Sequence, residues 1–347
     1  MAVRKVGSCR ILREVGRGGM GVIYEAYQDG LDRRVAVKAL DAGKSGSADR
    51  VERFRREGRA YAQIRHEAIP IVHDLVLKDD VLYLVTEFVD GADLHHVLAS
   101  GGRLPAECVA ALGARLADAL DCVHAHALLH RDVKPANVML SVRGDVKLMD
   151  FGIAKDPLAT ELTRTGTVVG SPGYVAPEVL EGEPASERSD VWSAGVTLYE
   201  LATWMKPFMG EDFHELFAAV RKARPIPIRE VVPGFPRRLA RAIERCLERR
   251  PSRRWETAGA LAAELEACAA GLLGGARPRE RLASLMLERG LGDVDGMAAI
   301  AGEEDPGVAV TRREEPDGSA RPSNRRIAWG FAAAMALAGL YAWLIRP

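Results

Sequence analysis

Two short polar blocks constrain this chain most: His130–Asn137, which reads HRDVKPAN, and Asp150–Gly152, which begins thirteen positions after Asn137. Together they supply two carboxylates and an amide, with a lysine between them. Such a set can hold magnesium and a polyphosphate while it orients a hydroxyl for attack. An isolated Asp-Phe-Gly triplet is weak evidence, whereas two such blocks in this order are strong. We therefore expect a fold that brings the two blocks together.

These blocks resemble the catalytic loop and the magnesium-binding loop of the protein kinase family. The spacing from Asp132 to Asn137 is that of the family, with Val133 where leucine is commoner. The resemblance covers about residues 9–268, and no catalytic residue of the family is missing. It implies an α+β, bilobal protein kinase fold: a small β-rich N-lobe with one helix, and a larger, mainly α-helical C-lobe. The Gly-Gly-Met-Gly run and the segment Asp190–Glu200 resemble those of bacterial eukaryotic-like serine/threonine kinases.

A glycine-rich segment lies between two predicted strands, 11–15 and 22–26. It could be a dinucleotide-binding fingerprint, but that motif requires a helix to follow. Because a second strand follows instead, we expect the glycines to cap a hairpin whose N–H groups can approach phosphates. The resemblance implies nucleotide contacts from the whole segment, namely Gly16, Arg17, Gly18, Gly19, Met20, Gly21 and Val22.

The run Val35–Lys38 predicts a strand, and its alternation puts Ala36 and Lys38 on one face, toward the nucleotide. In the family, this lysine binds the α- and β-phosphates. The segment 49–65 has helical spacing, with Glu57 on its inner side, where an unpaired carboxylate is unfavourable. Pairing between Glu57 and Lys38 would satisfy both charges, as the resemblance implies.

The residues that would bind the nucleotide base are assigned through the resemblance. A buried strand at 81–85 leads into 86–91, which corresponds to the hinge between the lobes, with Thr86 behind the base. The resemblance implies backbone contacts to adenine from Glu87 and Val89, a ribose contact from Asp93, and a sandwich of the adenine ring by Val22, Ala36 and Met139.

For the catalytic loop, the resemblance implies that Asp132 receives the proton of the substrate hydroxyl and that Lys134 neutralises the γ-phosphate. Asn137 and Asp150 would hold Mg²⁺. Lysine two places after the catalytic aspartate is typical of serine/threonine-specific members. The implied function is transfer of the ATP γ-phosphoryl group to Ser or Thr hydroxyls of proteins, with ATP and Mg²⁺ as cofactors. The alternative is a catalytically weak pseudokinase that acts as an ATP-binding scaffold, against which the intact catalytic set argues.

Further positions have regulatory or structural roles in the family. The segment 153–176 corresponds to the activation loop, and its threonines Thr163, Thr165 and Thr167 are candidate phosphosites. Autophosphorylation there would give Arg131 a phosphate to bind; otherwise the segment is only a threonine-rich loop. The resemblance implies an ion pair of Glu178 with Arg254. It also implies that Asp190 supports the catalytic loop together with His124.

The composition excludes several classes of protein. Lys plus Arg and Asp plus Glu both total 48, so net charge gives no reason to expect a nucleic-acid partner. The five cysteines are scattered, as in a cytosolic domain with reduced thiols. His124, His126 and His130 could be metal ligands, but no cysteine or carboxylate completes a zinc pattern, which favours structural histidines. The N-terminal residues do not read as a cleaved signal peptide.

We expect a kinase domain over 9–269, a largely flexible linker over 270–326 with a short helix at 282–287, and a transmembrane helix over 327–345. This last run of 19 uncharged residues follows three arginines and has aromatic residues at both ends. It predicts a single-pass protein of the cell membrane with a cytoplasmic kinase domain. The alternative is a soluble kinase with an Ala-rich, buried tail helix. Small residues at 330, 334 and 338 allow a homodimer through this helix.

Overall fold

In the computed structural model of the protein, the described residues are 4–18, 21–40, 56, 58–78, 81–150 and 172–292. The chain divides into two compact units, residues 1–301 and 302–347. Every described residue belongs to the first unit.

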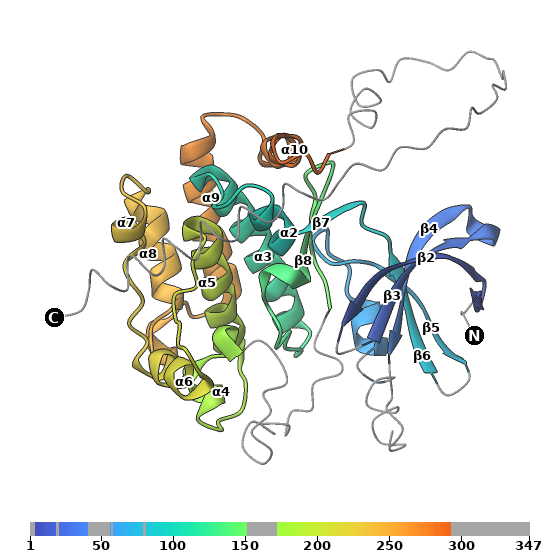
Figure 1. Ribbon diagram of the computed structural model, residues 1–347, viewed down its shortest axis with the longest axis horizontal. Coiled ribbons are helices and arrows are strands. Elements are labelled where there is room, and N and C mark those ends of the chain that lie inside the picture. The colour runs from blue at the N-terminus through green and yellow to red at the C-terminus, as the bar shows by residue number, and fades with distance from the viewer. Residues whose placement is uncertain are drawn as a thin grey trace. The chain divides into compact units, whose positions relative to one another are not determined.

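The described N-lobe is built on a six-stranded antiparallel sheet with the strand order β1-β2-β3-β4-β6-β5 (Figure 1, blue to cyan). Its strands are β1 (Lys5–Val6), β2 (Cys9–Gly18), β3 (Gly21–Gln28), β4 (Arg33–Leu40), β5 (Val72–Lys78) and β6 (Val81–Glu87), with a 3-10 turn, η1 (Asp29–Leu31), after β3. On β4, Val35 and Val37 are fully buried in the core of this lobe. Ala36 and Lys38 are half-buried on the opposite face, so the predicted alternation is confirmed.

The glycine-rich segment connects β2 and β3 as an antiparallel hairpin, in which Gly18 pairs with Gly21. Gly21 has a φ of +132°, a conformation that residues with a Cβ rarely adopt. A strand follows the glycines, as predicted, so the dinucleotide fingerprint is excluded. Gly19 and Met20, at the tip, lie outside the described residues.

The C-lobe is mainly helical and packs around α3 (Figure 1). Its apolar residues at helical spacing are buried, from Val109 and Leu112 through Leu116 and Leu120 to Val123. The helices are α2 (Leu94–Ala99), α3 (Ala106–Ala125), α4 (Pro177–Leu180), α5 (Glu187–Thr203), α6 (Phe213–Lys222), α7 (Ile228–Val231), α8 (Arg237–Cys246), α9 (Ala258–Leu273) and α10 (Pro278–Glu288), with 3-10 turns η2 (Pro135–Asn137), η3 (Pro172–Tyr174) and η4 (Pro251–Arg253).

Within the described part of this lobe, a second, three-stranded sheet follows the order β7-β8-β9. Its strands are β7 (Gly91–Asp93), β8 (Val138–Ser141) and β9 (Val146–Leu148). A Cβ on Gly91 would lie 2.1 Å from the carbonyl oxygen of Leu140, so glycine is required for β7 to approach β8. The sheet links the hinge to both polar blocks, because β8 begins directly after Asn137 and β9 ends two residues before Asp150.

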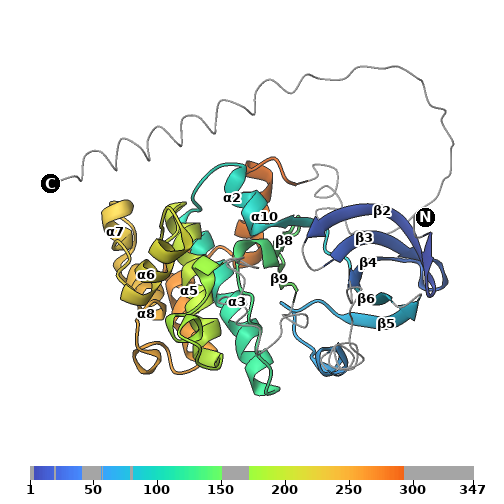
Figure 2. The same ribbon diagram turned by 60° about the horizontal axis from the view of Figure 1, so that its bottom comes forward.

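Helix α10 corrects the predicted domain boundary. It lies within 270–326, the segment predicted to be a largely flexible linker, yet Leu282, Leu285 and Met286 are at most 1% exposed. These side chains join the core cluster of the C-lobe, and α10 lies beside β8 (Figure 2). Burial of three large apolar side chains stabilises this docking, so the folded domain extends past residue 269. The short helix predicted at 282–287 is confirmed.

The turn between β8 and β9 supports α10 and gives a first testable prediction. Gly144 has a φ of +83°, and a Cβ there would lie 2.0 Å from the carbonyl oxygen of Arg279 on α10. Gly234 has a similar φ of +85°, but nothing lies within 4 Å of its Cβ position.

We expect Gly234→Ala to lower the free energy of unfolding by about 1 kcal/mol through backbone strain alone. Gly144→Ala should cost about 1–3 kcal/mol more, because α10 must shift. Urea denaturation of the two variants measures the difference, and equal losses would contradict this packing.

Among the described residues, no single helix has both the length and the apolar composition needed to cross a membrane; α9 and α10 meet the criteria only as a pair, bent by 70°. The predicted transmembrane run, 327–345, lies outside the described residues.

Candidate active site

The catalytic loop folds back on itself at Asp132. Its Oδ2 accepts hydrogen bonds from Nζ of Lys134 at 3.0 Å and from Nδ2 of Asn137 at 2.9 Å. The same amide nitrogen also donates to the carbonyl oxygen of Asp132 at 2.7 Å. The turn η2 makes this possible, because it reverses the chain between Lys134 and Asn137. Three of the predicted site residues therefore touch one another.

The second block is linked to this loop through the backbone and to the N-lobe through a side chain. The N–H of Met149 donates to the carbonyl oxygen of Asn137 at 2.7 Å, which places Asp150 beside the catalytic loop. Asp150 has a φ of +52°, in the left-handed region that is uncommon for a residue with a Cβ. Its Oδ1 lies 2.7 Å from Nζ of Lys38 on β4. An ion pair therefore links the N-lobe strand to the magnesium-binding block. Glu57, the predicted partner of Lys38, lies outside the described residues.

The side chains at this site fit a magnesium ion that is shared with a nucleotide. The amide nitrogen of Asn137 is used by Asp132, which leaves the amide oxygen for a metal, and the carboxylate of Asp150 could supply a second ligand. Magnesium is usually held by one or two carboxylates together with substrate phosphates. Among the described residues, no group of three or more His, Cys, Asp and Glu side chains could hold a metal. A zinc-type site built from His124, His126 and His130 therefore has no support in that part of the chain.

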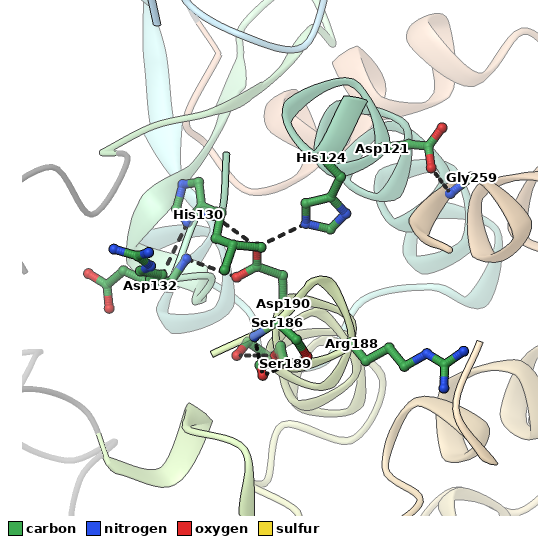
Figure 3. A network of polar contacts seen from close by, with 12 residues as sticks. Asp121, His124, His130, Asp132, Ser186, Arg188, Ser189, Asp190 and Gly259 are labelled. Carbon is green, nitrogen blue, oxygen red and sulfur yellow. Dashed lines mark hydrogen bonds and ion pairs between the residues drawn. The ribbon is translucent and has the colours of Figure 1, made fainter. Parts of the chain in front are cut away.

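Asp190 supports the catalytic loop from α5 (Figure 3). Its carboxylate accepts the N–H of His130 and the N–H of Arg131, both at 2.8 Å. It also contacts Nε2 of His124 at 2.9 Å. Arg131 has a φ of +62°, so the two N–H bonds hold a left-handed turn directly before Asp132. Asp190 is only 2% exposed, and these bonds offset the cost of burying its charge.

His130, the first residue of the first polar block, is fully buried. Its Nε2 lies 2.9 Å from the carbonyl oxygen of Met149, and its Nδ1 lies 3.3 Å from the N–H of Asp132. One ring nitrogen thus donates and the other accepts, which suits the neutral imidazole. Burial lowers the pKa of His130 below its ordinary value, although the nearby Asp190 opposes the shift.

The lowered pKa of His130 predicts a loss of stability at mildly acidic pH. Above about pH 6.5 the ring is neutral in both states, whereas below it only the unfolded chain takes up the proton. The free energy of unfolding should therefore fall by up to about 1.4 kcal/mol per pH unit until the folded-state pKa is reached. Urea denaturation between pH 7.5 and 5.5 should show a shallower dependence for His130→Gln than for the wild type. Identical slopes would mean that His130 does not carry the effect.

The predicted nucleotide-binding residues lie along the N-lobe sheet and the β7–β8 pair. Asp93 caps α2, with Oδ1 accepting the N–H of His96 at 2.9 Å and Oδ2 lying 2.7 Å from Nδ1 of the same residue. Met139 pairs with Asp93 across the sheet, and Ala36 pairs with Thr86. The hinge begins with the last two residues of β6, and the backbone N–H of Glu87 donates to the carbonyl oxygen of Ile71 at 2.9 Å. The described residues of the glycine hairpin are Gly16, Arg17, Gly18, Gly21 and Val22.

Glu178 and Arg254 form a two-pronged ion pair, with nitrogen-to-oxygen distances of 2.7 and 2.8 Å. The side chain of Arg254 is fully buried, and its guanidinium lies 4.8 Å from the ring centre of Trp192. It also donates to three backbone carbonyls, those of Arg188, Glu248 and Arg249. The pair joins the segment after residue 171 to the chain before α9.

Some predicted positions lie outside the described residues, and two ion pairs at the hinge were not predicted from the sequence. Thr163, Thr165 and Thr167 lie outside the described residues, as do Glu57, Gly19 and Met20. The unpredicted contacts are ion pairs at the hinge, formed by Lys147 with Glu87 and by Arg34 with Asp90. Lys147 lies on β9, and only the fold shows which residue lies opposite its side chain.

A β-rich N-lobe and a helical C-lobe that meet at this polar cluster make up the protein kinase fold. Comparison with known proteins agrees, because residues 9–265 match the protein kinase domain family. The chain is 35% identical over 344 residues to the serine/threonine-protein kinase PknA of Mycobacterium tuberculosis, covering 96% of this chain and 78% of PknA. It is 34% identical over 256 residues to a probable serine/threonine-protein kinase of Clostridium perfringens, covering 74% of this chain but 37% of that protein.

The structure is similar to the crystal structure of the PknI kinase domain of Mycobacterium tuberculosis. The TM-score is 0.60 at 27% sequence identity, and the match covers 76% of this chain and 97% of that one. The chain belongs to the protein kinase family, and these relatives are bacterial serine/threonine-protein kinases.

Proposed function

We propose that this protein transfers the γ-phosphoryl group of ATP to Ser or Thr hydroxyls of proteins. One observation carries the proposal: Lys38 pairs with Asp150, the preceding residue Met149 bonds to Asn137 through the backbone, and Asn137 bonds to Asp132. A phosphate-binding cation, two metal-binding groups and a candidate base are the parts that phosphoryl transfer needs in one place.

Each side chain has a distinct role in this proposal. Lys38 binds phosphate oxygens, and Asp150 and the amide oxygen of Asn137 hold Mg²⁺, which neutralises charge on the phosphates. Asp132 accepts a hydrogen bond from the substrate hydroxyl and receives its proton. Lys134, now 3.0 Å from Asp132, can move its ammonium to the γ-phosphate when a nucleotide is bound. Most of the acceleration would come from positioning and charge neutralisation.

The proposal extends to regulation and location. We propose that the protein phosphorylates itself on Thr163, Thr165 or Thr167, because an arginine precedes Asp132 and can bind a phosphate there. We also propose that residues 327–345 anchor the protein in the cell membrane as a single span, with the kinase domain in the cytoplasm and with homodimers formed through that helix. The length and lack of charge of that run support the anchor.

Mass spectrometry of the purified full chain, before and after incubation with Mg·ATP, tests the proposed function. We expect phosphate to appear on at least one threonine of 163–167, and Asp132→Asn should stay unmodified under the same conditions. A wild-type chain that binds ATP but gains no phosphate, alone or with a generic protein substrate, would favour the pseudokinase. Recovery of the full chain in a high-speed supernatant without detergent would count against the anchor.

A further inference from the structure

The segment 87–90 connects the two lobes. Its first residue, Glu87, forms an ion pair with the C-lobe. Nζ of Lys147, on β9, donates to Oε2 of Glu87 at 2.8 Å, and the Lys147 side chain is only 13% exposed. The same oxygen accepts the N–H of Ile71 at 3.3 Å. Glu87 is the last residue of β6, an N-lobe strand, and its carboxylate bonds to the C-lobe through Lys147 and to the N-lobe through Ile71.

Asp90, the last residue of the segment 87–90, is also bonded to both lobes. The carbonyl oxygen of Asp90 accepts the N–H of Val142, in the C-lobe, at 2.9 Å. Its carboxylate instead bonds to the N-lobe, because Nη1 of Arg34 on β4 donates to Oδ2 of Asp90 at 3.1 Å. Each end of the segment 87–90 is therefore bonded to both lobes.

Arg34 is itself held in place on the N-lobe sheet. Its Nε donates to Oε1 of Glu25 at 2.9 Å, and the Glu25 side chain is only 8% exposed. The guanidinium lies 4.1 Å from the ring centre of Phe88, in the middle of the connection. A cation over an aromatic ring adds to the attraction of the ion pair. Arg34 thus contacts the side chains of two residues of the segment 87–90, Phe88 and Asp90.

We propose that Arg34 and Lys147 are positioning residues for the nucleotide: their crossed ion pairs fix the segment 87–90 against both lobes and so set nucleotide affinity and release. The inference rests on the proposed function, in which the backbone of Glu87 and Val89 binds adenine. Glu87 is itself one of the paired residues and Val89 lies between Glu87 and Asp90, so a change in the angle between the lobes must stretch at least one pair. Neither Arg34 nor Lys147 touches the reacting atoms.

Binding of Mg·ADP to the purified full chain, measured by calorimetry, tests this inference without requiring phosphoryl transfer. We expect Arg34→Gln to raise the Kd by about 5-fold and Lys147→Gln by about 3-fold. The double variant should show the largest change. Arg34→Lys should recover part of the loss, because a lysine keeps the charge but not the planar contact with Phe88. In turnover, KM for ATP should rise while kcat stays the same or increases, since product release is often rate-limiting in kinases and lid-type enzymes.

The chain offers a matched control in Arg10. Its guanidinium also pairs with an aspartate, Asp29, at 2.8 Å and lies over an aromatic ring, that of Tyr27, at 5.8 Å, but on β2, two strands from Arg34 on β4. Arg10→Gln should leave the Kd for Mg·ADP unchanged. A Kd within two-fold of the wild type for Arg34→Gln and Lys147→Gln would overturn the inference, as would an equal rise in Arg10→Gln. Should Arg34→Gln fail to fold, Asp90→Asn removes the same pair at the exposed end.

The outcomes separate this inference from the proposed function. A wild-type chain that binds Mg·ADP but transfers no phosphate would refute the proposed function, while the Kd series would still decide on the crossed ion pairs. A wild-type chain that binds no Mg·ADP would refute both.

Discussion

Asp132→Asn is expected to lower kcat for phosphoryl transfer by about 10²–10⁴-fold, because the amide cannot accept the proton of the substrate hydroxyl. The fold should survive, since an amide oxygen can still accept the hydrogen bonds from Lys134 and Asn137. Nucleotide binding should also survive, because the phosphate and metal contacts are assigned to other residues. Rates measured with saturating Mg·ATP, together with the Kd for Mg·ADP, separate these effects.

Asp29→Asn is the matched control for that experiment. Asp29 forms an exposed surface pair with Arg10, so its loss should leave kcat unchanged. An Asp132→Asn protein that labels itself or a generic substrate at the wild-type rate would show that Asp132 is not the base. A variant that loses Mg·ADP binding to the same extent as activity would instead point to a structural role.

Glu178→Ala is expected to have the largest effect on stability, lowering the free energy of unfolding by about 3–5 kcal/mol. The reason is the charge that remains: Arg254 is fully buried, and without Glu178 its guanidinium keeps backbone carbonyls and the ring of Trp192 but no opposite charge among its described contacts. Replacing both residues, as Glu178→Ala with Arg254→Met, should cost less than the sum of the single losses, because no buried charge is left.

The control for this prediction is an ion pair of the same geometry at the surface. Arg238 and Glu264 also form a two-pronged pair, with distances of 2.7 and 2.8 Å, but the Arg238 side chain is 60% exposed. Glu264→Ala should cost about 1 kcal/mol or less, since water solvates the freed guanidinium. Urea denaturation of both variants tests the difference. Equal losses would mean that burial of Arg254 is not what makes its pair strong.

Local patterns predict the elements that carry the site. The alternation at 35–38 gives the face on which Lys38 lies, and the helical spacing of 109–123 gives the helix that leads to the catalytic loop. Both depend on residues close in the sequence, whose burial follows from a single period. The pairing of Glu178 with Arg254 came instead from the family resemblance, because no local pattern relates residues 76 positions apart.

The contacts that sequence reasoning missed are long-range ones. Arg34 and Lys147 read as ordinary charged residues of half-exposed strands, and only the folded chain shows that each lies against one end of the hinge. Helix α10 was missed as part of the domain for a related reason. Its apolar residues have helical spacing, but glycines and arginines surround them, and the surface they cover exists only once α3 and β8 have packed.

Transfer of label from ATP to the protein tests the central claim most directly. The wild-type chain is incubated with Mg²⁺ and ATP labelled at the γ-phosphate, with α-labelled ATP in a parallel reaction. Our account predicts acid-stable label on Ser or Thr from the γ-labelled nucleotide alone, dependent on Mg²⁺ and absent in Asp132→Asn. Label from the α-position, or no label on the chain or on any added protein while Mg·ADP still binds, would contradict it.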